Sequence, residues 1–376
     1  MAVRAAPTDP LAPDAEQLLA AMDSSRERTL ALVAPLSDEQ LERVHSPIMS
    51  PLVWDLAHIA AYEDLWIGHR LGGLRLLRPE LAALYDAFET PRAVRGDLEL
   101  LDAPAARAYL VEVRAQACEV IARAGAGDGL IAEMVLRHEL QHTETMRQTM
   151  AIGGLLAAGD RPAALPGSPG WLAVPAGRVQ IGAPDEGFAY DNERPRHEVE
   201  LGAFAIARLP VSNASWMHFS EGGGYERREW WSAEGWAWKE EYDISHHPAV
   251  ATGDPEAPVC HVSWFEADAF ARAHDARLPT EQEWERAATS EQPAQQLLGV
   301  GSVWEWTSSH FLPYPGFRAH PYKEYSEVFF GEDYRVLRGG SWATHERVAT
   351  PRFRNWDLPE RRQIFAGVRL ARREQA

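Results

Sequence analysis

Cysteine is nearly absent from this chain of 376 residues, which contains only Cys118 and Cys260. Two cysteines so far apart in sequence argue against a framework of structural disulfides, so we expect a protein of a reducing compartment, the cytoplasm. The chain also lacks any apolar run of 18 residues or more. A transmembrane helix needs such a run, and therefore no membrane-spanning segment is expected.

Basic residues are scarce as well. Lys and Arg total 37 against 55 Asp and Glu, which gives a formal net charge of −18. This excess of negative charge argues against nucleic acid or an anionic membrane as the main partner. A hydrophobic content of 45% and a charged content of 24% are ordinary for a globular protein. The length predicts two domains, or one large domain with appendages. We expect a monomer.

The first part of the chain, residues 14–156, has apolar residues at helical spacing. Four helices are predicted, from Asp14 into the thirties and over 51–70, 103–123 and 129–156. Short and medium links between them favour a four-helix bundle.

An irregular stretch, residues 88–102, interrupts the helical pattern and carries Arg92 and Arg95. These two arginines either lie in a solvated loop or form a clamp for an anion, because the planar guanidinium group binds carboxylates in a bidentate way.

Three histidines stand out in the helical half. His138 and His142 lie four residues apart in an apolar, glycine-free run, so they share one face of the predicted helix. His58 lies in a second apolar helical stretch. If the two helices pack together, the three imidazoles can hold one metal ion and leave coordination positions open, as a catalytic metal requires. Alternatively, they are ordinary core histidines with satisfied hydrogen bonds.

Residues 157–168 are rich in Ala, Pro and Gly and are predicted to be a linker. The character of the sequence changes after it, and residues 169–374 indicate a second, α+β domain. Helices are predicted at 263–274 and 280–288, each with a serine or threonine cap. Long segments such as 222–243, rich in Gly and Trp, are interpreted as irregular.

Four motifs of the second domain carry a resemblance. They are PVCHVSWFEADAFARAHDARLPTEQEWERAA (258–288), GSVWEWTSS (301–309), RVLRGGSW (335–342) and IFAGVRLAR (364–372). In this order they resemble the formylglycine-generating-enzyme-like fold, which is related to C-type lectins. The first domain looks like the four-helix bundle of the DinB superfamily, whose three-histidine metal site matches His58, His138 and His142. The two halves together resemble the ergothioneine-pathway sulfoxide synthases.

This resemblance implies an iron(II)-dependent, non-haem oxidoreductase that uses O₂. Such an enzyme joins hercynine, Nα-trimethylhistidine, to γ-glutamylcysteine or cysteine through a C–S bond and forms a sulfoxide. The resemblance also implies a role for each matching residue. The iron ligands would be His58, His138 and His142, and hercynine would be bound by Gln141, Asn355 and Trp356. The sulfur donor would be bound by Asp357, Arg92 and Arg95, and the catalytic tyrosine would be Tyr322, with Tyr325 as the alternative.

Other functions remain open at this point. A relative on the same scaffold joins hercynine to a selenosugar and makes selenoneine, and a zinc-dependent thiol transferase would need only the bundle. A non-enzymatic binding module is a further alternative. Formylglycine-generating activity is not expected, because that chemistry depends on a pair of cysteines and the second domain contains only Cys260. The link at 289–300 is also shorter than in many relatives, which alters the loop at that edge of the domain.

Overall fold

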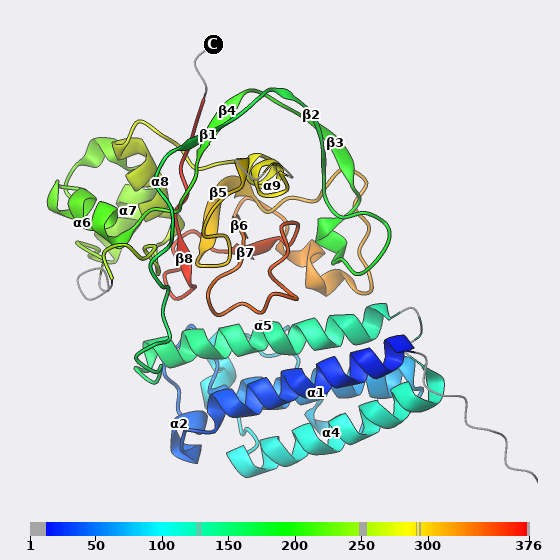
Figure 1. Cartoon of the computed structure of the whole chain (residues 1–376). Helices are drawn as coiled ribbons and strands as arrows, with labels where there is room; N and C mark the ends of the chain where they lie inside the picture. The colour runs from blue at the N-terminus through cyan, green and yellow to red at the C-terminus, as the bar shows by residue number, and fades with distance from the viewer. Residues whose placement is uncertain are drawn as a thin grey trace, which may run out of the picture. The chain divides into compact units, whose positions relative to one another are not determined.

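The computed structural model describes residues 13–125, 127, 129–247, 254–290, 292 and 295–373. The chain divides into two compact units, Met1–Leu155 and Leu156–Ala376. The first is helical and the second combines helices with short strands (Figure 1), which confirms the predicted fold class. Among the described residues, no helix combines the length and the apolar character that crossing a bilayer would need.

The first unit is built on three long helices, α1 (Pro13–Val33), α4 (Ala103–Ala124) and α5 (Leu130–Ile152). Helix α1 lies beside both α4 and α5 (Figure 1). The fourth helix, α3 (Leu52–Glu63), packs against α4 and α5, and a short α2 (Asp38–Glu42) precedes it. Nearly every side chain of α3 is buried, as its apolar sequence demands.

One predicted helix differs from the structure. Instead of an α-helix through residue 70, α3 ends at Glu63 and continues as the π-helical segment η1 (Asp64–Leu71). The wider turn is visible where the Gly72 amide donates to the Ile67 carbonyl. The first residue of this segment is Asp64, whose carboxylate accepts hydrogen bonds from the Leu77 amide and the Gln116 side chain. Apolar spacing alone cannot distinguish such a local widening from an ordinary helix.

The second unit contains three small sheets. One has the order β1 (Trp171–Val174), β4 (Phe204–Ala207), β9 (Ala371–Arg373), and a hairpin joins β2 (Gly177–Ile181) to β3 (His197–Leu201). The third has the order β7 (Asn355–Asp357), β6 (Arg335–Arg338), β5 (Trp304–His310), β8 (Ala366–Gly367). All pairs are antiparallel except β5 with β8. An apolar cluster around Phe204, Ile206 and Trp284 packs the first sheet against α9 (Glu281–Ala288).

Four helices complete this unit: α6 (Asn213–Glu221), α7 (Ala233–Glu241), α8 (Trp264–Ala273) and α9 (Glu281–Ala288). The predicted helices α8 and α9 are confirmed, and both begin with a reciprocal capping box. The interpretation of residues 222–243 as wholly irregular was wrong, because α7 lies within them. The Ser232 hydroxyl caps it by accepting from the Gly235 amide, and Trp238 packs against Phe265. Tertiary packing of its tryptophans outweighs the weak helical pattern.

Candidate metal centre

The structure brings the three histidines of the first unit together. His58 comes from α3, and His138 and His142 come from successive turns of α5. One ring nitrogen of each lies within 4.8 Å of the others, and the Nε2 atoms of His58 and His138 are 3.1 Å apart. His58 is buried, and the other two are partly exposed. The distant helices therefore meet at a point where one ion can contact three imidazoles.

Hydrogen bonds on the outer ring nitrogens orient two of these imidazoles. The Nδ1 atom of His58 lies 2.6 Å from the Tyr85 carbonyl oxygen, and that of His142 lies 2.8 Å from the Asp55 carboxylate. Both partners can only accept, so each Nδ1 donates the proton of its hydrogen bond, and Nε2 is the nitrogen left for a metal. This arrangement, an acceptor behind a histidine, is what metal-ligating histidines show in proteins.

The protonation state of the cluster also suits a metal. Burial, together with the neighbouring imidazoles, lowers the pKa of His58 and of His138 well below the ordinary histidine value. Both rings are therefore neutral near pH 7, and neutral imidazole is the form that donates to a metal. The buried Asp55 adds a negative charge, and its Oδ2 atom has no hydrogen-bond partner among the described residues. A cation in the cluster would compensate that charge.

Aromatic side chains enclose the cluster. The Trp54 ring stacks on His58 at 4.5 Å, and the Tyr62 ring stacks on His138 at 3.7 Å and 11°. Sequence reasoning missed these two residues and Asp55. The spacing offered a signal, because Trp54 and Tyr62 lie four residues before and after His58 on the same helix, where side chains share a face.

The other candidate residues of the first unit, Gln141, Arg92 and Arg95, differ in how far they are exposed to solvent. Gln141 is partly exposed and lies three residues after His138, on the same side of α5. Arg92 is exposed, whereas Arg95 is buried. The Arg95 guanidinium donates to the Thr90 and Ala87 carbonyls and to the Ser50 hydroxyl.

The same guanidinium of Arg95 lies 3.4 Å from the centroid of the Trp54 ring, the ring that stacks on His58. Arg95 thus packs against the side chain that supports His58. Burial lowers the pKa of Arg95 to about 10. The two arginines do not form a matched pair facing solvent.

The candidates of the second unit gather around β7. Asn355 and Asp357 project from one face of this strand and Trp356 from the other, since side chains alternate along a strand. Trp356 stacks on Phe311 at 4.2 Å and 9°. The Asp357 carboxylate accepts hydrogen bonds from the Leu358 amide and from Gln363.

The two candidate tyrosines lie close to this strand. Tyr325 meets Trp356 edge to face at 6.0 Å, and Tyr322 meets Tyr325 in the same way at 6.3 Å. The opposite side of Tyr325 is covered by Tyr190, stacked at 4.3 Å. Both tyrosines are partly exposed.

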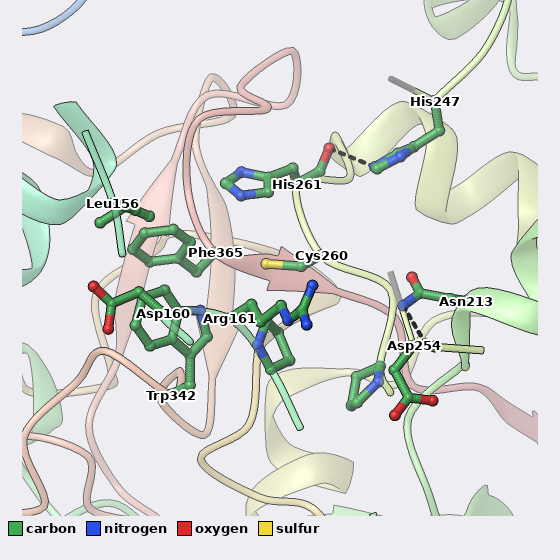
Figure 2. A pocket seen from close by; sticks show the side chains of 12 residues that line it. Leu156, Asp160, Arg161, Asn213, His247, Asp254, Cys260, His261, Trp342 and Phe365 are labelled. Carbon is green, nitrogen blue, oxygen red and sulfur yellow. Dashed lines mark hydrogen bonds between the residues drawn. The ribbon is translucent and has the colours of Figure 1, made fainter. Parts of the chain in front are cut away.

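A cavity of about 200 Å³ lies elsewhere in the second unit (Figure 2). Cys260, Trp342 and Phe365 line it, together with His247 and His261. His247 Nε2 lies 3.1 Å from the His261 carbonyl oxygen, the contact drawn dashed in Figure 2. His261 has a φ of 69°, which is uncommon for a residue other than glycine. None of the residues that the resemblance assigns to a substrate is among the described residues lining this cavity.

Comparison with known proteins agrees with this architecture. Residues 21–146 match the DinB superfamily, and residues 160–298 and 296–374 match the sulfatase-modifying factor enzyme 1-like domain. The chain is 41% identical to the hercynine oxygenase of Mycobacterium tuberculosis, covering 95% of this chain and 98% of that protein. The hercynine oxygenase of Mycolicibacterium smegmatis is also 41% identical, over 92% of this chain and 96% of its own length. Ergothioneine biosynthesis protein 1 of Schizosaccharomyces pombe is 25% identical, over 64% of this chain and 38% of that protein.

The chain is therefore a two-domain protein that joins a DinB-type helical bundle to a sulfatase-modifying-factor-like domain. Both parts align with the curated relatives over nearly the whole length of each protein. The chain belongs to the ergothioneine-pathway sulfoxide synthase family, the family of the hercynine oxygenases.

Proposed function

We propose that this protein is an iron(II)- and O₂-dependent enzyme that joins the sulfur of γ-glutamylcysteine or cysteine to the imidazole of hercynine and yields a sulfoxide. The convergence of three imidazoles within 4.8 Å of one another carries the proposal. Two of them have acceptors behind the ring, as a metal site requires. The full-length likeness to hercynine oxygenases supports the choice of substrate.

In this proposal His58, His138 and His142 hold the iron. Three nitrogen ligands leave about three positions of an octahedron free. A bound ferrous ion would lower the pKa of a thiol and activate O₂, while holding both co-substrates close together. Asp55 and the Tyr85 carbonyl hold the His142 and His58 rings in place, and the Trp54 and Tyr62 rings, which stack on His58 and His138, would keep water away from the site.

The remaining residues of the bundle bind and orient substrate. We assign Gln141 to a hydrogen bond with the hercynine imidazole, because it lies on the histidine face of α5. Arg92 is the exposed arginine, so we assign the donor's carboxylate to it first. Arg95 can take part only by giving up hydrogen bonds that it already makes to the chain.

Residues of the second unit complete the proposal. We assign Asn355 and Trp356 to hercynine, whose trimethylammonium group favours an aromatic face. Asp357 is assigned to the amino group of the donor. We propose Tyr322 as the proton donor beside the reacting oxygen, with Tyr325 as the alternative, because Tyr325 is stacked on Tyr190.

The test is oxygen consumption by the Fe(II)-loaded full chain with hercynine and each donor, followed by the mass of the product. Hercynine with γ-glutamylcysteine or cysteine should consume O₂ and give a sulfoxide, and the His138→Ala variant should give none. Turnover with a selenosugar instead would reassign the protein as a selenoneine synthase. Thiol transfer by the zinc-loaded protein without O₂ would refute the oxygenase proposal.

The choice between the two tyrosines can be tested with the same assay. Replacing the acting tyrosine by Phe should lower the share of C–S product and raise the share of simply oxidised thiol, because a proton donor is lost at the reacting oxygen. We expect this shift for Tyr322→Phe and an unchanged product ratio for Tyr325→Phe. The reverse pattern would transfer the role to Tyr325.

A further inference from the structure

A second cavity of the sulfatase-modifying-factor-like unit has a charge opposite to that of the chain as a whole. It measures about 510 Å³ and is lined by four arginines, Arg178, Arg196, Arg286 and Arg352. The other described lining residues are neutral, and no Asp or Glu is among them. In a chain with a net charge of −18, a concave site with only positive charges is unexpected from composition. We name it the arginine groove.

Distant parts of the sequence build the arginine groove. Arg178 lies on β2, Arg196 precedes β3, Arg286 lies on α9, and Arg352 lies in the loop before β7. Helix α9 packs beside β2, which brings the first and third of these elements together. The four guanidinium groups therefore converge through folding and not through a local run of basic sequence.

These arginines have few internal partners within the described residues. No hydrogen bond or ion pair of the Arg196, Arg286 or Arg352 side chain occurs within the part of the chain that the structure describes. Arg178 has one contact of 3.4 Å with Glu198, and both side chains are more than half exposed. An exposed pair of this kind contributes little. Among the described residues, at least three positive charges thus line the groove without a paired carboxylate.

Helix α9, which carries Arg286, offers no unpaired glutamate to the groove. The three glutamates of α9 turn away from the groove into the core, and each is already paired. The pairs are Glu281 with Arg354, Glu283 with Arg277 and Glu285 with Arg338. Arg286 is the residue of this helix that is left exposed. The three glutamates of α9 are therefore not available to pair with the arginines of the groove.

We propose that the arginine groove binds a small anion that carries two or three linked phosphates. Guanidinium groups present paired N–H donors that match phosphate oxygens, and several of them suit a ligand with several charges. A volume of about 510 Å³ suits a small molecule, and the negative charge of the rest of the chain repels a long polyanion. The linked phosphates can belong to a nucleotide or to an inorganic oligophosphate. The groove makes a site separate from the histidine cluster, so the proposal goes beyond the reaction proposed above.

The experiment is calorimetric titration of the full chain with inorganic triphosphate and, in a second arm, with ATP. One anion per chain should bind, and binding should weaken as salt is raised, because exposed charges are screened. Arg286→Gln and Arg352→Gln should each weaken binding about tenfold, the usual effect of losing one charged hydrogen bond. Arg286 is exposed and Arg352 is partly exposed, and neither belongs to the buried core, so both can be replaced without disturbing it. Equal affinity in both arms assigns recognition to the phosphates alone, and a tighter ATP arm adds the nucleoside to the ligand.

Two matched variants control the test. Arg373→Gln removes an exposed arginine of the same unit outside the groove and should leave the affinity unchanged. The His138→Ala variant lacks a proposed iron ligand and should still bind triphosphate, which separates this proposal from the proposed catalytic function. Absence of binding to the wild-type chain overturns the proposal. So does equal weakening by Arg373→Gln, or loss of binding in His138→Ala, which would place the anion at the metal centre.

Discussion

The Asp55→Asn substitution tests the proposed metal centre most directly. Asp55 is 1% exposed, and one of its oxygens accepts the Nδ1 proton of His142 at 2.8 Å. Asparagine keeps the shape and an acceptor oxygen for that proton but removes the negative charge behind the ring. Loss of such a partner typically weakens metal binding by about 10- to 100-fold. That corresponds to about 1.4 to 2.8 kcal/mol of binding free energy.

The same substitution has an opposite effect on the metal-free protein. Without a cation, the wild-type chain buries a carboxylate with an unpartnered Oδ2 atom, which costs stability. We therefore expect Asp55→Asn to unfold at a higher temperature than the wild type when metal is removed. The gain in stability on adding Fe(II) should shrink. At a metal concentration of about 100 times the wild-type Kd, it should fall from about 2.7 to about 1.4 kcal/mol for a tenfold loss of affinity.

Thermal unfolding under argon, with and without Fe(II), measures both effects in one series. Asp97→Asn, an exposed substitution in the same unit, is the control and should leave both values unchanged. If Asp55→Asn binds Fe(II) as tightly as the wild type, Asp55 does not orient a metal ligand. The assignment of the histidines as a metal centre would then lose its main electrostatic support.

Three further outcomes are expected. Glu139→Ala removes one partner of a buried ion-pair network and should destabilise the protein by about 3 to 5 kcal/mol in urea unfolding. The control is Glu112→Ala at the exposed pair with Arg78, which should cost about 0 to 1 kcal/mol. Burial lowers the pKa of His247 from 6.5 to about 4, so the unfolded chain binds a proton between these values that the folded chain does not. The share of stability that comes from this group should then be fully present above pH 6.5 and fall by about 1.4 kcal/mol per pH unit toward pH 4. His247→Phe should remove that share, and the slope due to His58 and His138 should remain. His138→Ala should leave the bundle folded by circular dichroism and should lose bound iron in a metal analysis, and retention of iron would contradict its role as a ligand.

Much of the architecture could be predicted because it depends on local sequence patterns, namely helical spacing and helix caps. Helical spacing located the four bundle helices, and the capping boxes at Ser263 and Thr280 located two helices of the second unit. The same logic placed His138 beside His142, since residues four apart share a helix face. The approach of His58 depended on the resemblance, because no local rule says which helices pack together.

The features that could not be predicted depend on tertiary contacts. Arg95 looked like a partner of Arg92 for an anion, but packing inserts it behind Trp54, where backbone carbonyls use its donors. Helix α7 forms in a segment whose glycine and tryptophan content indicated a loop. The arginines of the groove come from four separate parts of the sequence, so no sequence motif predicts the groove. In each case the deciding partner lies far away along the chain.

The alignment of the histidine cluster depends on a network of buried charges in the bundle. Arg26 of α1 and Arg114 of α4 each bridge Glu63 and Glu139, with all four contacts between 2.7 and 2.9 Å. Both glutamates are at most 1% exposed, and Glu139 directly follows His138. Desolvation offsets much of the attraction in such pairs, so their main effect is on specificity rather than on stability.

A slip of one residue along α5 would move the glutamate by about 1.5 Å and turn it by about 100°, which breaks both of its bridges. The same slip would carry His138 and His142 off the face that meets His58. The network therefore penalises the registers in which three imidazoles cannot share an ion. This explains why charged groups occupy the core of the bundle beside the cluster, where apolar side chains would pack with less desolvation.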